Sequence, residues 1–116
     1  MKKLFKKIFF LSLILSLTGC FKSLKPGTYE SEGNGHNKDK KIKISVVIND
    51  DKKIESIKVL DHGENDELGG VALESLVKDA VEKNSDKIDV IAGATETTEG
   101  FKEALNHALE EARDAK

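Results

Sequence analysis

Hydrophobic residues in the first half of the domain alternate with polar ones, which is the period of a β-strand. Between residues 42 and 48 an isoleucine or valine occupies every second position, and residues 49–52 then form a polar turn. Residues 54–60 resume an apolar pattern, so the two segments predict an antiparallel hairpin with one covered face. Residues 28–33 follow a Pro-Gly turn and predict an edge strand.

Two later segments carry hydrophobic residues at intervals of three and four, which predicts amphipathic helices. The first covers residues 73–81 and the second covers residues 101–113, with Phe101 assigned to the core. The short apolar run at residues 88–91 is expected to be a strand that leads into the second helix. The chain is therefore expected to fold as an α+β domain, a small antiparallel sheet with two helices packed on it.

The N-terminus has the pattern of a secretory signal peptide. Four lysines precede an apolar run at residues 8–17, which is too short to span a bilayer as a helix. The sequence Leu17-Thr18-Gly19-Cys20 follows and resembles a bacterial lipobox, in which the cysteine is diacylated and becomes the new N-terminus. The other interpretation of this sole cysteine is a free thiol in an uncleaved anchor.

A lipidated Cys20 would divide the chain into three parts. Residues 1–19 would be a cleaved signal peptide, residues 20–26 a lipidated tether, and residues 27–116 the folded domain. Two acyl chains would hold this domain stably at the cell membrane, on its extracytoplasmic face. We therefore expect a lipoprotein anchored to the outer face of the cytoplasmic membrane.

The charge balance of the mature chain argues against one class of partner. Residues 1–19 contain four lysines and no acid, so their removal leaves 15 basic and 21 acidic residues, a net charge of −6. Nucleic acids are bound through basic surfaces that neutralise phosphates. We therefore expect no nucleic-acid partner.

Residues 89–100 combine small residues with three threonines directly before the second helical pattern. A helix N-terminus has unpaired N–H groups and a partial positive charge, which favour an anion such as a phosphate. Gly93 and Ala94 would let a bulky group approach the backbone. Thr97 or Thr98 could instead cap the helix. From the residues alone, an anion site and a simple helix cap are both open.

The order Asp-x-x-(Ser/Thr)-Gly-Ala-Thr resembles the acceptor motif of the FMN-binding domain family, with Ala92 where Ser or Thr is usual. The resemblance covers roughly residues 26–112. In that family a flavin transferase esterifies FMN, through its phosphate, to the last threonine of the motif, which here is Thr95. The other residues that the resemblance implies at the flavin are Asp89, Gly93, Ala94, Thr97 and Thr98.

The loop at residues 61–70 is rich in residues that could carry chemistry. Its histidine and carboxylates could suggest a metal site, but their spacing fits no standard motif. A solvated acidic loop is the simpler interpretation. In the FMN-binding domain family a similar loop, which ends in glycine and precedes a helix, lies near the flavin. The resemblance therefore implies roles at the cofactor for His62, Glu64 and Gly69.

No pattern in the chain predicts a catalytic residue or a metal ligand, so an electron carrier is more expected than a stand-alone oxidoreductase. The resemblance implies a membrane-anchored extracytoplasmic flavoprotein that relays electrons. Its expected partners are a flavin transferase and membrane redox partners, either quinone-linked proteins or other flavoproteins. The second hypothesis is a lipoprotein binding module of the same fold without covalent flavin, which binds a small anion or a protein.

Overall fold

The computed structural model describes residues 23–65 and 67–115, so the expected signal peptide, Cys20 and the start of the tether lie outside the described residues. The three strands pair antiparallel in the order β1-β2-β3. No helix among the described residues is long and apolar enough to cross a membrane. The elements are β1 (Gly27–Gly33), β2 (Ile42–Ile48), β3 (Ile54–Asp61), α2 (Gly69–Lys83) and α3 (Thr95–Asp114). The predicted α+β fold is confirmed.

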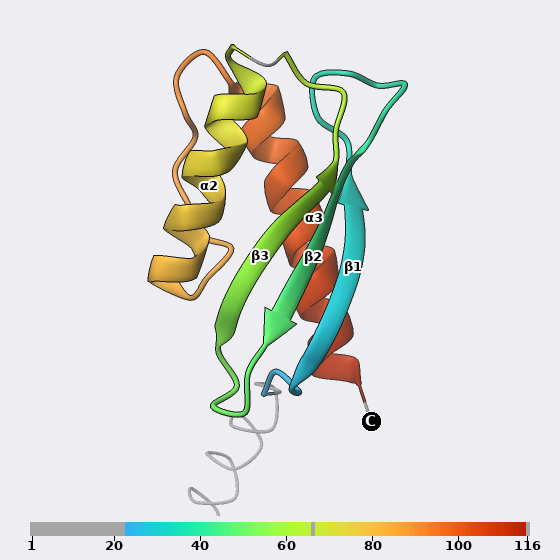
Figure 1. The fold of residues 1–116 in the computed structure, drawn as a ribbon, viewed down its shortest axis with the longest axis vertical. Coiled ribbons are helices and arrows are strands. Elements are labelled where there is room, and N and C mark those ends of the chain that lie inside the picture. Colours follow the sequence, from blue (N-terminus) through green and yellow to red (C-terminus); the bar gives the residue numbers. More distant parts are fainter. Residues whose placement is uncertain (1–22, 66, 116) are drawn as a thin grey trace, which may run out of the picture.

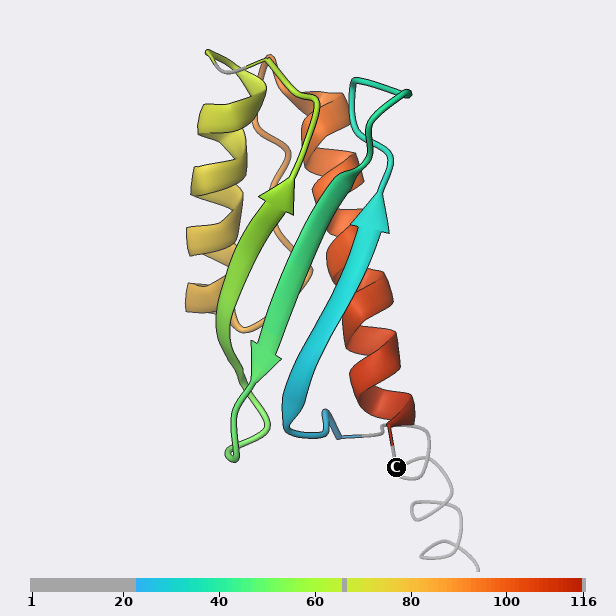
Figure 2. The ribbon, with the colours of Figure 1, turned by 45° about the vertical axis from the view of Figure 1, so that its right-hand side comes forward.

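Strand β2 lies in the middle of the sheet, and its alternating pattern faces the core. Ile42, Ile44, Val46 and Ile48 are buried, while the residues between them are partly exposed. Both helices pack on this one face of the sheet (Figures 1 and 2). α3 contacts β1 and β2, whereas α2 contacts β3. The aliphatic core is closed by Phe101, which is fully buried as expected.

Strand β1 and helix α3 approach each other through glycines. A Cβ atom on Gly33 would lie 2.0 Å from the carbonyl oxygen of Gly100, and one on Gly100 would lie 2.6 Å from the backbone of Gly35. The Ser31 hydroxyl donates a hydrogen bond to the Ala104 carbonyl of α3. Because no side chain separates them, the end of β1 lies directly against the first turns of α3.

The expected strand at residues 88–91 is not formed. Ile88 is buried in the core, but Asp89 and Val90 are exposed. Residues 89–91 lie against α2, where they share a shallow depression with Ser75 and Leu76. A helix offers no row of free amides and carbonyls, so this segment has no ladder to join and remains irregular.

Both helices begin earlier than their apolar stripes predicted. α2 begins at Gly69, so the Gly69-Gly70 pair forms its first turn. α3 begins at Thr95 and has Ala94 as its N-cap, with no side-chain cap hydrogen bond. The expectation that Thr97 or Thr98 caps this helix was therefore wrong. Both lie inside the first turn of α3, where the Thr97 hydroxyl donates to Glu64 and the Thr98 hydroxyl donates to the Ala94 carbonyl.

The two ends of the domain are built from different segments. α2 and α3 begin at the same end, beside the loops that follow β1 and β3 (Figure 1). The turn between β2 and β3, the start of β1 and the end of α3 lie at the opposite end (Figure 1). There the amide of Lys25 donates a 2.9 Å hydrogen bond to the carbonyl of Ala112. The chain therefore enters the domain far from the N-termini of its helices.

Candidate functional site

A pocket of about 410 Å³ lies between the N-termini of α2 and α3. The segments around it come from four places in the chain: the loop after β1, the loop after β3, the start of α2 and the start of α3. The pocket combines the positive ends of two helices with apolar and hydroxyl groups. Its lining residues are His36, Asn65, Leu68, Gly69, Gly93, Ala94, Thr95, Glu96 and Thr97.

A tight turn at residues 91–94 delivers the chain to α3. The amide of Ala94 donates a 2.9 Å hydrogen bond to the carbonyl of Ile91, which closes the turn. Gly93 is its third residue and has a φ of +84°, as a type II turn requires. Thr98 joins the two ends of this turn, because its hydroxyl donates to the Ala94 carbonyl at 2.8 Å and accepts from the Ile91 amide at 3.2 Å.

The N-terminus of α3 is open toward the pocket. The Thr98 amide donates to the Ala94 carbonyl at 2.9 Å, and this bond begins the helical ladder. The amides of Thr95, Glu96 and Thr97 precede it and have no acceptor within the helix. Thr95 itself is exposed. The arrangement can therefore bind an anion beside a solvent-accessible threonine hydroxyl.

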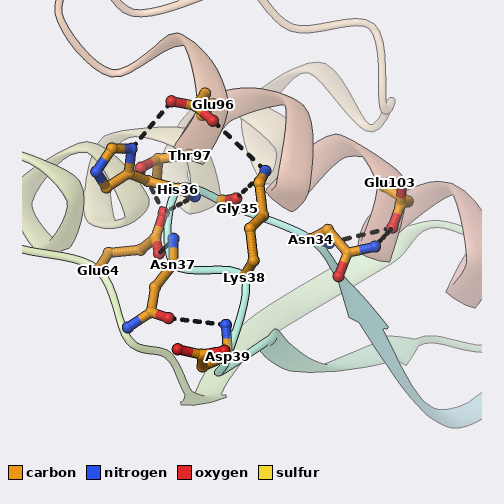
Figure 3. Close-up of polar contacts among 10 residues, drawn as sticks. All are labelled: Asn34, Gly35, His36, Asn37, Lys38, Asp39, Glu64, Glu96, Thr97 and Glu103. Atoms are coloured by element: carbon orange, nitrogen blue, oxygen red, sulfur yellow. Dashed lines mark hydrogen bonds and ion pairs between the residues drawn. The ribbon is translucent and has the colours of Figure 1, made fainter.

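Glu64 connects the loops around the pocket to α3 (Figure 3). Its carboxylate is buried and accepts hydrogen bonds from the Thr97 hydroxyl at 2.6 Å, the His36 amide at 2.8 Å and the Asn37 amide at 3.2 Å. Burial opposes its ionisation, but these three donors outweigh burial and hold the pKa of Glu64 below its ordinary value. The ionised carboxylate therefore holds the polar loop at residues 34–41 against the start of α3.

Glu96 carries a negative charge at the rim of the pocket, and two cationic or basic side chains surround it (Figure 3). His36 Nδ1 lies 2.9 Å from one carboxylate oxygen of Glu96, and Lys38 Nζ lies 3.4 Å from the other. The hydrogen bond from His36, followed by Lys38, lowers the pKa of Glu96. The partners offset a charge that would otherwise repel an anion at the helix N-terminus.

The structure brings most of the residues predicted for the site together. Glu64 lies directly behind the pocket wall, and its amide donates a 3.1 Å hydrogen bond to Nδ1 of His62. Thr98 is buried beneath the turn. The predicted residues that line the pocket are Gly69, Gly93, Ala94, Thr95 and Thr97.

Asp89 lies apart from the pocket. Its side chain is fully exposed and is 4.0 Å from Lys83 Nζ. It lines a separate depression with residues of α2. Although Asp89 begins the acceptor motif in the sequence, the turn at residues 91–94 separates it from Thr95.

Four of the lining residues were not predicted from the sequence: His36, Asn65, Leu68 and Glu96. Asn65 and Leu68 lie within the loop from which His62, Glu64 and Gly69 were chosen, and Glu96 lies between two chosen threonines. Their position next to predicted site residues was therefore the signal that could have identified these three. His36 had no such signal, because the contact that brings it to the pocket joins residues far apart in the chain.

The chemistry of the pocket fits a flat aromatic ligand that carries a phosphate. The open helix end suits the phosphate, and Thr95 offers a hydroxyl beside it. Leu68 lines the pocket and keeps 62% of its surface exposed, so it provides apolar surface for a ring. No cluster of three potential metal ligands occurs in residues 23–65 and 67–115.

Comparison with known proteins agrees with this chemistry. The chain is 31% identical over 88 residues to an uncharacterised protein of Treponema pallidum (strain Nichols). The aligned residues make up 76% of this chain but only 24% of that protein. The crystal structure of CPE2226 protein from Clostridium perfringens is similar with a TM-score of 0.62 at 29% identity, over 80% of this chain and 92% of that one. Residues 35–110 match the FMN-binding domain family. The chain therefore belongs to the FMN-binding domain family.

Proposed function

We propose that this protein carries FMN as a phosphoester on Thr95 and relays electrons at the outer face of the cytoplasmic membrane, where lipid on Cys20 holds it. The observation that carries the proposal is the exposed Thr95 at the uncapped N-terminus of α3, inside a pocket of matching chemistry. The family supports flavin binding. The covalent bond, the electron relay and the anchor are the parts that we propose.

Attachment would use the Thr95 hydroxyl as the nucleophile toward an activated flavin phosphate. The Oγ1–P bond would form as the hydroxyl gave up its proton. With flavin adenine dinucleotide as the donor, the pyrophosphate bond would break and AMP would leave. Because a threonine hydroxyl is a weak nucleophile without a base, we assign its activation to a flavin transferase. The free amides of α3 would stabilise the phosphate charge.

The domain would then hold and orient its flavin. Bound FMN supplies the redox chemistry, and the protein supplies orientation, partial exclusion of water and electrostatics. The ester would keep the flavin from being lost by dilution outside the cytoplasm. The net charge of −6 on the mature chain would disfavour anionic reduced flavin and so lower the reduction potential.

The test is the intact mass of the exported full chain after co-expression with a flavin transferase. We expect a gain of one FMN less one water in the wild type and in Thr97→Ala, but not in Thr95→Ala. Flavin that remains attached to Thr95→Ala would overturn the site. A colourless wild type without mass gain would overturn the covalent carrier and favour a binding module.

The anchor is tested separately by fractionation of the same cells. Wild-type chain should partition with membranes and release only with detergent. Cys20→Ser should remain an unprocessed precursor, because the lipid and the cleavage site depend on the same cysteine. A mature Cys20→Ser chain of unchanged size and partitioning would contradict lipidation at this residue.

A further inference from the structure

The entry of the described chain and the pocket lie at opposite ends of the domain. The Lys25–Ala112 hydrogen bond fixes the entry of the chain beside the last turns of α3, whereas Thr95 begins this helix. From Thr95 to Ala112 the helix spans ~25 Å. Cys20 precedes Lys25 by five residues, which reach at most ~18 Å when fully extended. A lipid on Cys20 therefore cannot bring the membrane attachment point to the pocket.

Large hydrophobic side chains remain exposed at four positions among the described residues, and one of them, Leu68, lines the pocket. The four are Leu60, Leu68, Val71 and Val90, with exposed fractions of 41%, 62%, 56% and 49%. Leu68 lines the pocket, and Val71 is one helical turn further along α2. Ser75 follows one turn later and shares a depression with Val90. Leu68, Val71 and Val90, which we call the apolar strip, are therefore spaced along α2 from the pocket, with the exposed Ser75 between Val71 and Val90.

Acidic residues border this apolar strip. Glu67 and Glu74 are exposed on either side of Val71 in the sequence, and Asp89 precedes Val90 with a fully exposed side chain. Lys78 lies one turn beyond Glu74, at the far end of the strip. Exposed apolar surface with a polar rim is typical of a protein interaction site. The excess of acidic groups favours a partner whose contact surface is basic at its edge.

We propose that the redox partner of the bound flavin docks on the apolar strip, and that it is an extracytoplasmic protein with an apolar contact area ringed by basic residues. This inference rests on the proposed function. The competing partner is a quinone dissolved in the bilayer, and the second experiment below distinguishes it from a protein. Reduced FMN would pass one electron to each of two one-electron acceptors and return to oxidised FMN, with its protons released to solvent.

The first experiment uses the lipidated holoprotein in vesicles, with covalent FMN verified by intact mass. Its reduced flavin is mixed in stopped flow with a ferric basic c-type cytochrome, which serves as the probe for a basic-rimmed partner. Val71→Lys and Val90→Lys place a repelling charge on the strip without burying it. We expect either change to slow flavin oxidation by about tenfold or more.

Ser56→Lys is the matched control. Ser56 is exposed and pairs with Val47, which lies between the core residues Val46 and Ile48 in β2, so both face away from the helices. This change adds the same charge to the whole protein and should alter the rate by less than about twofold. Equal slowing by all three variants, or by none of them, would overturn the docking site.

The second experiment measures the distance between flavin and bilayer. Nitroxide-labelled lipids should leave the flavin fluorescence of the anchored protein unchanged, whereas soluble iodide should quench it. Quenching by the lipids would mean that the strip contacts the membrane, and would overturn the proposal in favour of a bilayer partner. A colourless protein without the FMN mass would instead show that the proposed function itself fails.

Discussion

Thr97 Oγ1 donates a 2.6 Å hydrogen bond to the carboxylate of Glu64, and both residues are buried. The same carboxylate accepts the amide of His36, so one side chain joins the loops after β1 and β3 to the first turn of α3. Because the Thr97 hydroxyl is directed at Glu64, it does not cap α3. The bond therefore shapes the pocket and leaves the helix N-terminus free for a ligand.

Glu64→Gln should lower the free energy of unfolding by about 1–3 kcal/mol, since three donors lose a charged acceptor and meet an amide group. Urea denaturation followed by circular dichroism measures this change. Glu67→Gln, an exposed change in the same loop, should stay within about 0.5 kcal/mol of wild type. Equal stability of the two variants would show that the carboxylate does not hold these loops.

Acid should weaken the fold partly through Glu64. Its pKa is held below the ordinary value of 4.5, so its ionised form stabilises the native state above that pH. This contribution is lost as the pH falls from 4.5 through the native pKa, because the unfolded chain binds the proton first. Urea midpoints measured between pH 6 and about pH 2.5 should fall less steeply in Glu64→Gln than in wild type. Parallel curves would contradict a depressed pKa at this residue.

Thr98→Val should destabilise the protein by about 1–3 kcal/mol and still accept FMN. The change leaves the Ile91 amide without its side-chain acceptor but keeps the shape of the buried residue. Thermal denaturation and intact mass of the same preparation give both results. Loss of all attached flavin from a folded Thr98→Val protein would show that this hydroxyl takes part in attachment.

Ala92→Ser should raise the yield of covalent FMN, because it restores the residue that the acceptor motif usually has. Ala92 is exposed in the turn before α3, so stability should change by less than about 0.5 kcal/mol. The ratio of loaded to unloaded protein in the intact mass spectrum measures the yield. An unchanged or lower yield would mean that position 92 does not limit recognition by the transferase.

Gly100→Ala should destabilise the fold by about 1–3 kcal/mol although alanine favours helices, since its Cβ would lie 2.6 Å from the backbone of Gly35. Glu99→Ala, on the exposed side of the same turn, is the control and should be nearly neutral or slightly stabilising. Chemical denaturation of both variants compares them directly. A stabilised Gly100→Ala protein would contradict the close approach of the loop after β1 to α3.

The spacing of hydrophobic residues along the chain was sufficient to predict the three strands of the sheet and the apolar faces of both helices. Alternation along residues 42–48 reflects one covered face of β2, and the stripe that includes Leu73 and Leu76 reflects one covered face of α2. The same spacing was insufficient to predict the conformation of residues 88–91, because a short apolar run is compatible with a buried segment of any conformation. Their conformation depends on which element lies beside them, and this neighbour is α2.

The sequence by itself determined the α+β fold, three of its strands and both helices in their order along the chain, and the resemblance to its family. Each of these depends on residues that are near one another in the chain. Tertiary structure alone decided that His36 lies at the pocket, that Asp89 does not, and that the pocket is at the far end from the chain entry at Lys25. Periodicity records how much of a side chain is buried, whereas these relationships depend on contacts between distant segments, such as those of Glu64 with His36 and Thr97.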